Sequence, residues 1–188
     1  MNLINQIKQK LSKMDLDNSL ILISVGAKNY NEAIVQLTKY LNTDKKLPGI
    51  YVTVNKPYST IKRIFEDNGI NTKTILFIDA ITKSTIGKNE DCLFVGAPED
   101  LTGISIAISE AVKSLPEKRK FLFFDSISTL SIHNTAGSVA KFTHFLTANM
   151  RQWGVVGVII LLKRETEQEL IDKLYQFCDI TIELGGEK

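Results

Sequence analysis

The residues with the clearest chemical potential lie in the turn after the first apolar segment, residues 19–25. The turn runs from Gly26 to Ala33, the place and length of the phosphate-binding pattern G-x-x-x-x-G-K-[ST] after a buried strand. The first glycine is present, but Asn31 stands at the second glycine, Glu32 at the lysine and Ala33 at the hydroxyl residue that would hold Mg²⁺. A side chain at the second glycine obstructs backbone approach to a phosphate, and a carboxylate repels it. The turn therefore predicts a phosphate site that has lost its chemistry.

Two further residues of this turn leave alternatives open. Ala27 and Lys28 complete the remnant, and Lys28 could supply a substitute positive charge. The spacing of Asn29 and Glu32 also fits a capping box, in which the two side chains satisfy the first N–H groups of the following helix. The capping box is the favoured interpretation because it needs no ligand.

Asp125 is the second candidate. It ends the apolar run Phe121–Phe124, a pattern typical of the strand whose aspartate holds Mg²⁺ through water in phosphate-binding enzymes. Asp79 follows a similar run, residues 75–78, and many α/β proteins end a buried strand with a solvated or capping aspartate. Asp125 is therefore expected to be mainly structural and hydrogen-bonded to a neighbouring loop.

Other common chemistries are not supported. Cys92 and Cys178 form no CxxC pair, and with His133 and His144 as the only histidines no metal site of the usual N/S spacing can be assembled. The sequence also lacks the glycine spacing of a dinucleotide site and the G-x-S-x-G elbow of a hydrolase. No acidic pair follows the first strand, as a phosphoryl-accepting receiver would need. We expect no catalytic residues, no metal and no enzyme activity.

The composition predicts one compact soluble domain. The chain has 188 residues, 44% of them hydrophobic and 23% charged, with a formal net charge of +2. This balance does not indicate nucleic-acid binding, which usually needs a clear basic excess. The sequence shows neither a signal peptide nor an apolar stretch long enough for a membrane span, so a cytoplasmic protein is expected.

Short apolar runs alternate with amphipathic segments along the whole chain. Strands are predicted at residues 19–25, 49–54, 74–79, 92–95, 120–125, 155–162 and 179–184. Helices are predicted at residues 30–41, 57–68, 101–114, 135–152 and 165–177. This alternation predicts a three-layer αβα sandwich with a mainly parallel sheet, formed by a single domain over residues 1–188.

Two smaller expectations concern side chains outside the turns. In the long helix, Phe142, Phe145, Leu146, Met150 and Trp153 have the spacing of a core-facing stripe, and His144 lies off it. Residues 118–120 are three consecutive basic residues and are expected in a solvated loop.

Several segments together resemble the archaeal KaiC-like members of the RecA superfamily of P-loop ATPases. The resemblance runs from Leu20 to Leu184 and is carried by residues 49–54, 124–130, 141–146, 151–155 and 177–184. It implies a RecA-like core that in active relatives binds ATP between the subunits of a ring. Active relatives also follow their second strand with two glutamates that activate the attacking water, where this sequence has Asn55 and Lys56.

Neither Asn55 nor Lys56 can act as a general base at neutral pH. The main hypothesis is therefore a catalytically inactive KaiC-like domain that works as a regulatory or protein-interaction module without a cofactor. The alternative is a degenerate ATPase that still binds Mg-ATP at the Gly26 turn, through Lys28 and Asp125. Under the main hypothesis the partners are unidentified proteins. Without a bridging nucleotide, a dimer or a monomer is favoured over a closed ring.

Overall fold

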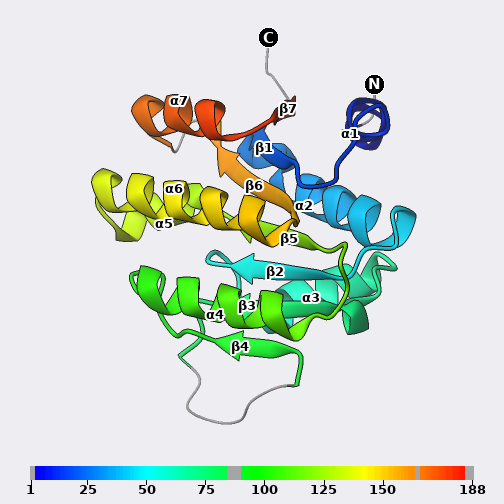
Figure 1. Cartoon of the computed structure of the whole chain (residues 1–188), viewed down its shortest axis with the longest axis horizontal. Coiled ribbons are helices and arrows are strands. Elements are labelled where there is room, and N and C mark those ends of the chain that lie inside the picture. Colours follow the sequence, from blue (N-terminus) through cyan, green and yellow to red (C-terminus); the bar gives the residue numbers. More distant parts are fainter. Residues whose placement is uncertain (1–2, 84–89, 164–165, 185–188) are drawn as a thin grey trace.

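The computed structural model describes residues 3–83, 90–163 and 166–184. Its centre is a sheet of seven parallel strands in the order β4-β3-β2-β5-β6-β1-β7 (Figure 1). The strands are β1 (Leu20–Val25), β2 (Gly49–Thr53), β3 (Ile75–Asp79), β4 (Cys92–Phe94), β5 (Phe121–Asp125), β6 (Val156–Leu162) and β7 (Ile180–Leu184). Because all strands run in one direction, their carboxyl ends lie along one edge of the sheet. In parallel α/β sheets, this is the edge at which ligands bind.

Helices cover both faces of the sheet. One face carries α1 (Leu3–Leu11), α2 (Tyr30–Lys39) and α3 (Tyr58–Asp67). The other carries α4 (Leu101–Ser114), α5 (Ile127–His133), α6 (Ala136–Trp153) and α7 (Gln168–Phe177). Short helical turns flank these elements: η1 (Ala27–Asn29), the π turn η2 (Tyr40–Asp44) and η3 (Thr72–Thr74).

The central strands contribute side chains to two separate cores. In β1, Ile21 and Ile23 pack on the face of α1, α2 and α3, whereas Leu20 and Leu22 pack on the opposite face. This is why the central strands read as unbroken apolar runs in the sequence. The predicted three-layer αβα sandwich with a parallel sheet is confirmed.

The predicted elements agree with the structure, with two helices added and with the last predicted helix, residues 165–177, beginning at Gln168. Residue 165 lies outside the described part of the chain. Helix α1 was not predicted, and neither was α5, which begins directly after β5 where Ser126 accepts a hydrogen bond from the Thr129 N–H. The long helix ends at Trp153, because Gly154 adopts the left-handed conformation (φ 66°) that a glycine tolerates best.

Two side-chain expectations hold for all but one residue each. In the long helix, Phe142, Leu146 and Met150 are buried and Trp153 is partly buried, and in the basic run Lys118 and Arg119 are exposed, as predicted. Phe145 is 50% exposed, and the buried stripe of α6 is made by Val139, Phe142, Leu146 and Met150 with two threonines. Lys120 does not lie in a solvated loop. It is buried, and its Nζ donates hydrogen bonds to the carbonyl oxygens of Val112, at 2.9 Å, and Leu115 at the end of α4.

His144 lies on the exposed side of α6, as its place off the stripe predicts. The centres of its ring and of the Phe177 ring are 5.1 Å apart. Among the helices in the described part of the chain, none is long and apolar enough to cross a bilayer.

Candidate functional site at the carboxyl ends of the strands

The turn after β1 is narrower than a phosphate-binding loop. Gly26 has φ −77° and ψ 149°, an extended conformation open to any residue, and η1 follows at once and leads into α2 at Tyr30. The Asn29 N–H donates to the Gly26 carbonyl oxygen at 3.0 Å. The chain therefore closes a tight helical turn here and does not open a wide loop lined by N–H groups.

The predicted capping box is wrong. Asn29 makes no side-chain cap hydrogen bond, and its φ of −101° and ψ of 0° are close to helical values. An N-cap residue normally has extended dihedral angles, which place its side chain over the first N–H groups. Because η1 runs into α2 without an extended residue between them, Asn29 lacks that geometry.

The remnant residues differ in exposure. Gly26, Ala27, Lys28, Asn31 and Glu32 are all exposed at the sheet edge. Their neighbour at the hydroxyl position, Ala33, is fully buried in the core under α2. The structure therefore brings the five exposed residues together at one surface, while Ala33 serves packing.

The residues after β2 reach across the sheet edge to the start of α2. The Asn55 side-chain amide donates to the Tyr30 hydroxyl at 3.1 Å, and Lys56 Nζ donates to Asn31 Oδ1. Lys56 Nζ also lies 5.4 Å from the centre of the Tyr30 ring, at the distance of a cation–π contact. Burial lowers the pKa of Lys56. Sequence reasoning noted Asn55 and Lys56 only as losses and missed that they bond to the remnant turn.

Asp125 is fully buried at the end of β5. The Tyr51 hydroxyl donates to its Oδ2 at 2.6 Å, and its Oδ1 has no hydrogen-bond partner among the described residues. Burial raises the pKa of Asp125 to about 8, so the carboxyl group is mostly protonated at pH 7. The expected hydrogen bond to a neighbouring loop is wrong, because the partner is a side chain of the adjacent strand β2.

Asp79, at the end of β3, has the opposite environment. It is also fully buried, but its carboxylate accepts from the backbone N–H groups of Tyr58, Ile81 and Thr82 at 2.8–2.9 Å, and from the Thr82 hydroxyl at 2.6 Å. Asp79 therefore caps α3 from another strand. The capping interpretation of such aspartates holds here, and the solvated one does not.

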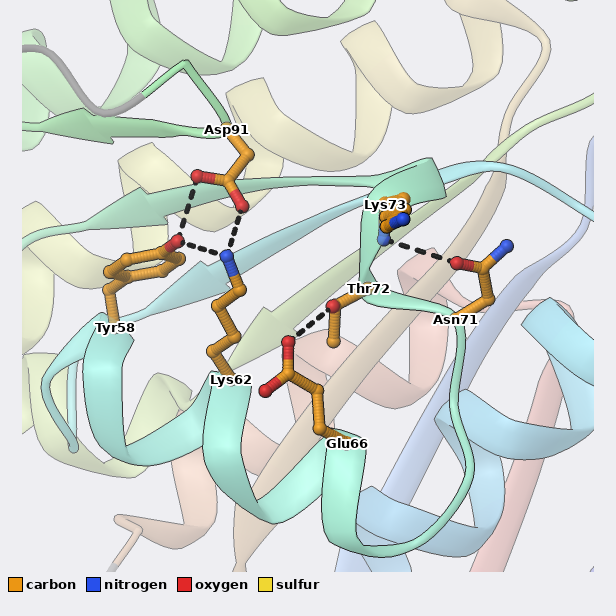
Figure 2. A network of polar contacts seen from close by, with 7 residues as sticks. All are labelled: Tyr58, Lys62, Glu66, Asn71, Thr72, Lys73 and Asp91. Atoms are coloured by element: carbon orange, nitrogen blue, oxygen red, sulfur yellow. Dashed lines mark hydrogen bonds and ion pairs between the residues drawn. The ribbon is translucent and has the colours of Figure 1, made fainter.

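A second polar cluster lies beside this capped helix, at the edge strand β4 (Figure 2). Lys62 Nζ donates to Asp91 Oδ2 at 2.7 Å and to the Tyr58 hydroxyl at 2.9 Å, and that hydroxyl donates to Asp91 Oδ1 at 2.7 Å. These contacts raise the pKa of Lys62. Burial acts against the ion pair, but Lys62 and Tyr58 still hold the pKa of Asp91 below its usual value. The cluster ties β4 to α3, and its groups satisfy one another.

Mg²⁺ would need an ionised carboxylate at this edge, and a nucleoside triphosphate would need open N–H groups at the start of α2. Within residues 3–83, 90–163 and 166–184, no group of three metal-ligating side chains is found. The one carboxyl group in the expected place, Asp125, is buried and holds its proton. The N-terminal turn of α2 carries Glu32 and is bridged by Lys56.

This arrangement, a parallel seven-stranded sheet between two layers of helices, is a fold that solved structures share. Three structures from Pyrococcus horikoshii share the fold. A KaiC-like protein has 14% sequence identity and a TM-score of 0.68, and the match covers 92% of this chain and 75% of that one. A second protein has 13% identity, a TM-score of 0.67 and coverage of 95% and 87%, and an uncharacterized protein in complex with an unknown peptide has 13% identity, a TM-score of 0.71 and coverage of 95% and 82%. A search of curated proteins gave no significant match.

The chain itself belongs to a family described as "Family of unknown function (DUF7504)", which matches residues 18–184.

Proposed function

We propose that this chain is a catalytically inactive KaiC-like domain that acts as a regulatory or protein-interaction module. The observation that carries the proposal is the bond from Lys56 Nζ to Asn31 Oδ1. A side chain at the position of a catalytic glutamate is bonded there to the side chain at the position of a phosphate-loop glycine. Both positions would need to face a nucleotide in an active enzyme, and here they face each other.

The charges at this edge support the same conclusion. Glu32 stands in the first turn of α2, where a phosphate would be held, and its carboxylate opposes an anion. Asp125 would have to lose its proton before it could hold Mg²⁺ through water, and burial opposes that loss. Neither Asn55 nor Lys56 provides a carboxylate to activate water.

A role in protein contacts is consistent with an intact fold that has lost its catalytic groups. One structural neighbour was solved with an unknown peptide, which supports peptide or protein binding as a property this fold can have. The proposed partner is a protein. A dimer or a monomer is expected in preference to a ring because no nucleotide bridges the subunits, and the cytoplasm is the proposed location.

Isothermal calorimetry and phosphate release test this proposal. We expect no heat of binding with 1 mM Mg-ATP, no shift in the melting temperature and no phosphate release above the protein-free rate. The variant Glu32→Lys, which restores only the exposed lysine, should behave in the same way. ATP binding at millimolar affinity or tighter by the wild-type chain would refute the proposal.

One observation favours a second candidate, a degenerate domain that still binds Mg-ATP. The buried Oδ1 of Asp125 has no partner among the described residues, and Lys28 lies exposed in the turn after β1. Under this alternative, Asp125→Ala abolishes Mg-dependent binding, and wild-type affinity rises as pH approaches 8 because the metal needs the ionised carboxylate. Binding that is unchanged in Asp125→Ala would refute it.

A further inference from the structure

At the edge of the sheet where the strands end, the chain's own side chains connect two separate turns. Strands β1 and β2 are separated in the sheet by β5 and β6, so the segments that follow them are not neighbours within the sheet. The start of α2 nevertheless meets the β2–α3 turn through Tyr30, Asn31, Asn55 and Lys56. In parallel α/β sheets, ligands commonly bind at this edge.

Each of the four side chains contacts at least one of the other three. Tyr30 is almost fully buried, and its hydroxyl accepts from Asn55 while its ring faces the Lys56 ammonium group. That ammonium group donates to Asn31 Oδ1. In the part of the chain that the structure describes, Lys56 Nζ has no carboxylate partner. The positive charge therefore contacts an amide oxygen and an aromatic face that both belong to the start of α2.

The β2–α3 turn is held rigidly enough to present these groups. The Thr53 hydroxyl donates to the Lys56 carbonyl oxygen at 2.6 Å, and the Lys56 N–H donates back to it at 3.2 Å. The next residues enter α3, whose first N–H is fixed by Asp79. Asn55 and Lys56 therefore project from a turn anchored to both β2 and β3.

We propose that Tyr30, Asn31, Asn55 and Lys56 form an intramolecular clasp that takes the place of a ligand at this edge. The clasp holds α2 to the β2–α3 turn without a nucleotide, and it occupies the approach to the first turn of α2. This inference rests on the proposed absence of nucleotide binding and adds what replaces the nucleotide.

Two double-mutant cycles in nucleotide-free buffer test the clasp. The first combines Lys56→Met with Asn31→Ala, and the second combines Tyr30→Phe, which removes only a hydroxyl, with Asn55→Ala. We expect each single variant to lower the melting temperature by about 2–4 °C, and each double variant to lower it by clearly less than the sum. Additive effects in both cycles would overturn the proposal.

A matched control lies at the other end of the same helical segment. Lys45 Nζ is 5.5 Å from the centre of the Tyr40 ring, nearly the 5.4 Å of the Lys56–Tyr30 contact. Unlike that contact, it joins two residues of one turn, because Tyr40 begins η2 and Lys45 directly follows it. Lys45→Met should change the melting temperature by less than about 1 °C, because an exposed local contact of this kind contributes little. If Lys45→Met lowers the melting temperature as much as Lys56→Met does, the contacts among Tyr30, Asn31, Asn55 and Lys56 have no special role and the proposal is overturned.

Sodium tripolyphosphate serves as an anion probe for the same site. The wild-type melting temperature should not rise with up to 10 mM tripolyphosphate, and a dose-dependent rise would overturn the claim that the clasp replaces a ligand. The two proposals fail separately. If the double-mutant cycles are additive and no ATP binds, the clasp proposal is refuted and the proposal of an inactive domain stands. If calorimetry shows ATP binding, the proposal of an inactive domain is refuted whatever the cycles show.

Discussion

The buried carboxyl group of Asp125 makes a prediction that depends only on its environment. The change is Asp125→Asn, which replaces the carboxyl group by a neutral group of the same shape. An amide oxygen can still accept the Tyr51 hydroxyl, as Asp125 Oδ2 does at 2.6 Å. The variant therefore resembles the wild type with a protonated Asp125 at every pH, and it has no titrating group at this position.

The sign and size follow from linkage between proton binding and folding. The pKa of Asp125 is raised from 3.8 to about 8 in the folded chain, because burial disfavours the charged form. Between these values the folded chain binds a proton that the unfolded chain releases. The free energy of unfolding therefore falls as pH rises, by about 1.4 kcal/mol per pH unit. At pH 7 the accumulated loss is about 4 kcal/mol relative to a group that does not titrate.

Urea unfolding of both proteins at pH 5, 6, 7 and 8 measures this loss. The free energy of unfolding of Asp125→Asn minus that of the wild type should grow by about 3 kcal/mol from pH 5 to pH 7 and level off above pH 8. Burial raises the pKa of Tyr51 well above its usual 10, so Tyr51 does not titrate in this window. A difference that stays constant from pH 5 to pH 8 would refute the reasoning, because Asp125 would then be ionised in the folded chain.

Three further substitutions test the other buried or clustered groups by urea unfolding. Asp79→Ala leaves buried N–H groups without an acceptor and should cost about 3 kcal/mol at pH 7; a cost below 1 kcal/mol would contradict its capping role. Lys62→Met should cost about 1 kcal/mol at neutral pH, and the deficit should shrink on acidification, because the lowered pKa of Asp91 stabilises only where that group is ionised. Lys120→Met removes two hydrogen bonds at the end of α4 and should cost about 1–2 kcal/mol, whereas the exposed Lys118→Met should cost almost nothing; equal effects would refute the assignment.

The layers of the fold could be predicted from the sequence because the signal is spread over many residues. The predicted strand 49–54 is β2 (Gly49–Thr53), and the predicted strand 155–162 is β6 (Val156–Leu162). Each such run is buried on both faces, which only a covered parallel sheet allows. Short helices carry fewer periods, and α5 (Ile127–His133) was therefore missed.

The order of burial around one helix was harder to predict. Phe145 and Leu146 are adjacent apolar residues, and both fit an i, i+3, i+4 pattern. Only Leu146 is buried. The buried residues Val139, Thr143 and Thr147 show that the inward face of α6 includes Leu146 and leaves Phe145 outside it. The threonines can face the core since their hydroxyl groups bond to carbonyl oxygens of the same helix, as Thr143 does to Val139 at 2.7 Å.

The candidate site shows a similar limit. The replacements at Asn31, Glu32 and Lys56 are legible in the sequence, but the bond between Asn31 and Lys56 depends on how α2 crosses the sheet. The contact between Tyr51 and Asp125 depends on strand register. Tyr51 pairs with Phe123 and stacks on its ring at 5.1 Å, so its hydroxyl reaches along the strand to the residue two positions further on.

Asp79 and Asp125 show why the same pattern leads to different chemistry. Both follow four residues of a buried strand, and both lie in register with Thr53, on its two sides. After Asp79 the chain turns back, and the N–H groups of Ile81 and Thr82 point at the carboxylate. After Asp125 the chain enters α5 at once.

In the first turn of α5, the N–H groups of Thr129 and Leu130 donate to the hydroxyl and carbonyl oxygens of Ser126 and not to Asp125. Asp125 is therefore left with the Tyr51 hydroxyl alone, and its carboxyl group keeps its proton at neutral pH. A protonated carboxyl group can donate and accept hydrogen bonds but binds cations poorly. The two strand ends therefore differ in the groups that meet the carboxyl: three N–H groups and a hydroxyl at Asp79, and one hydroxyl at Asp125.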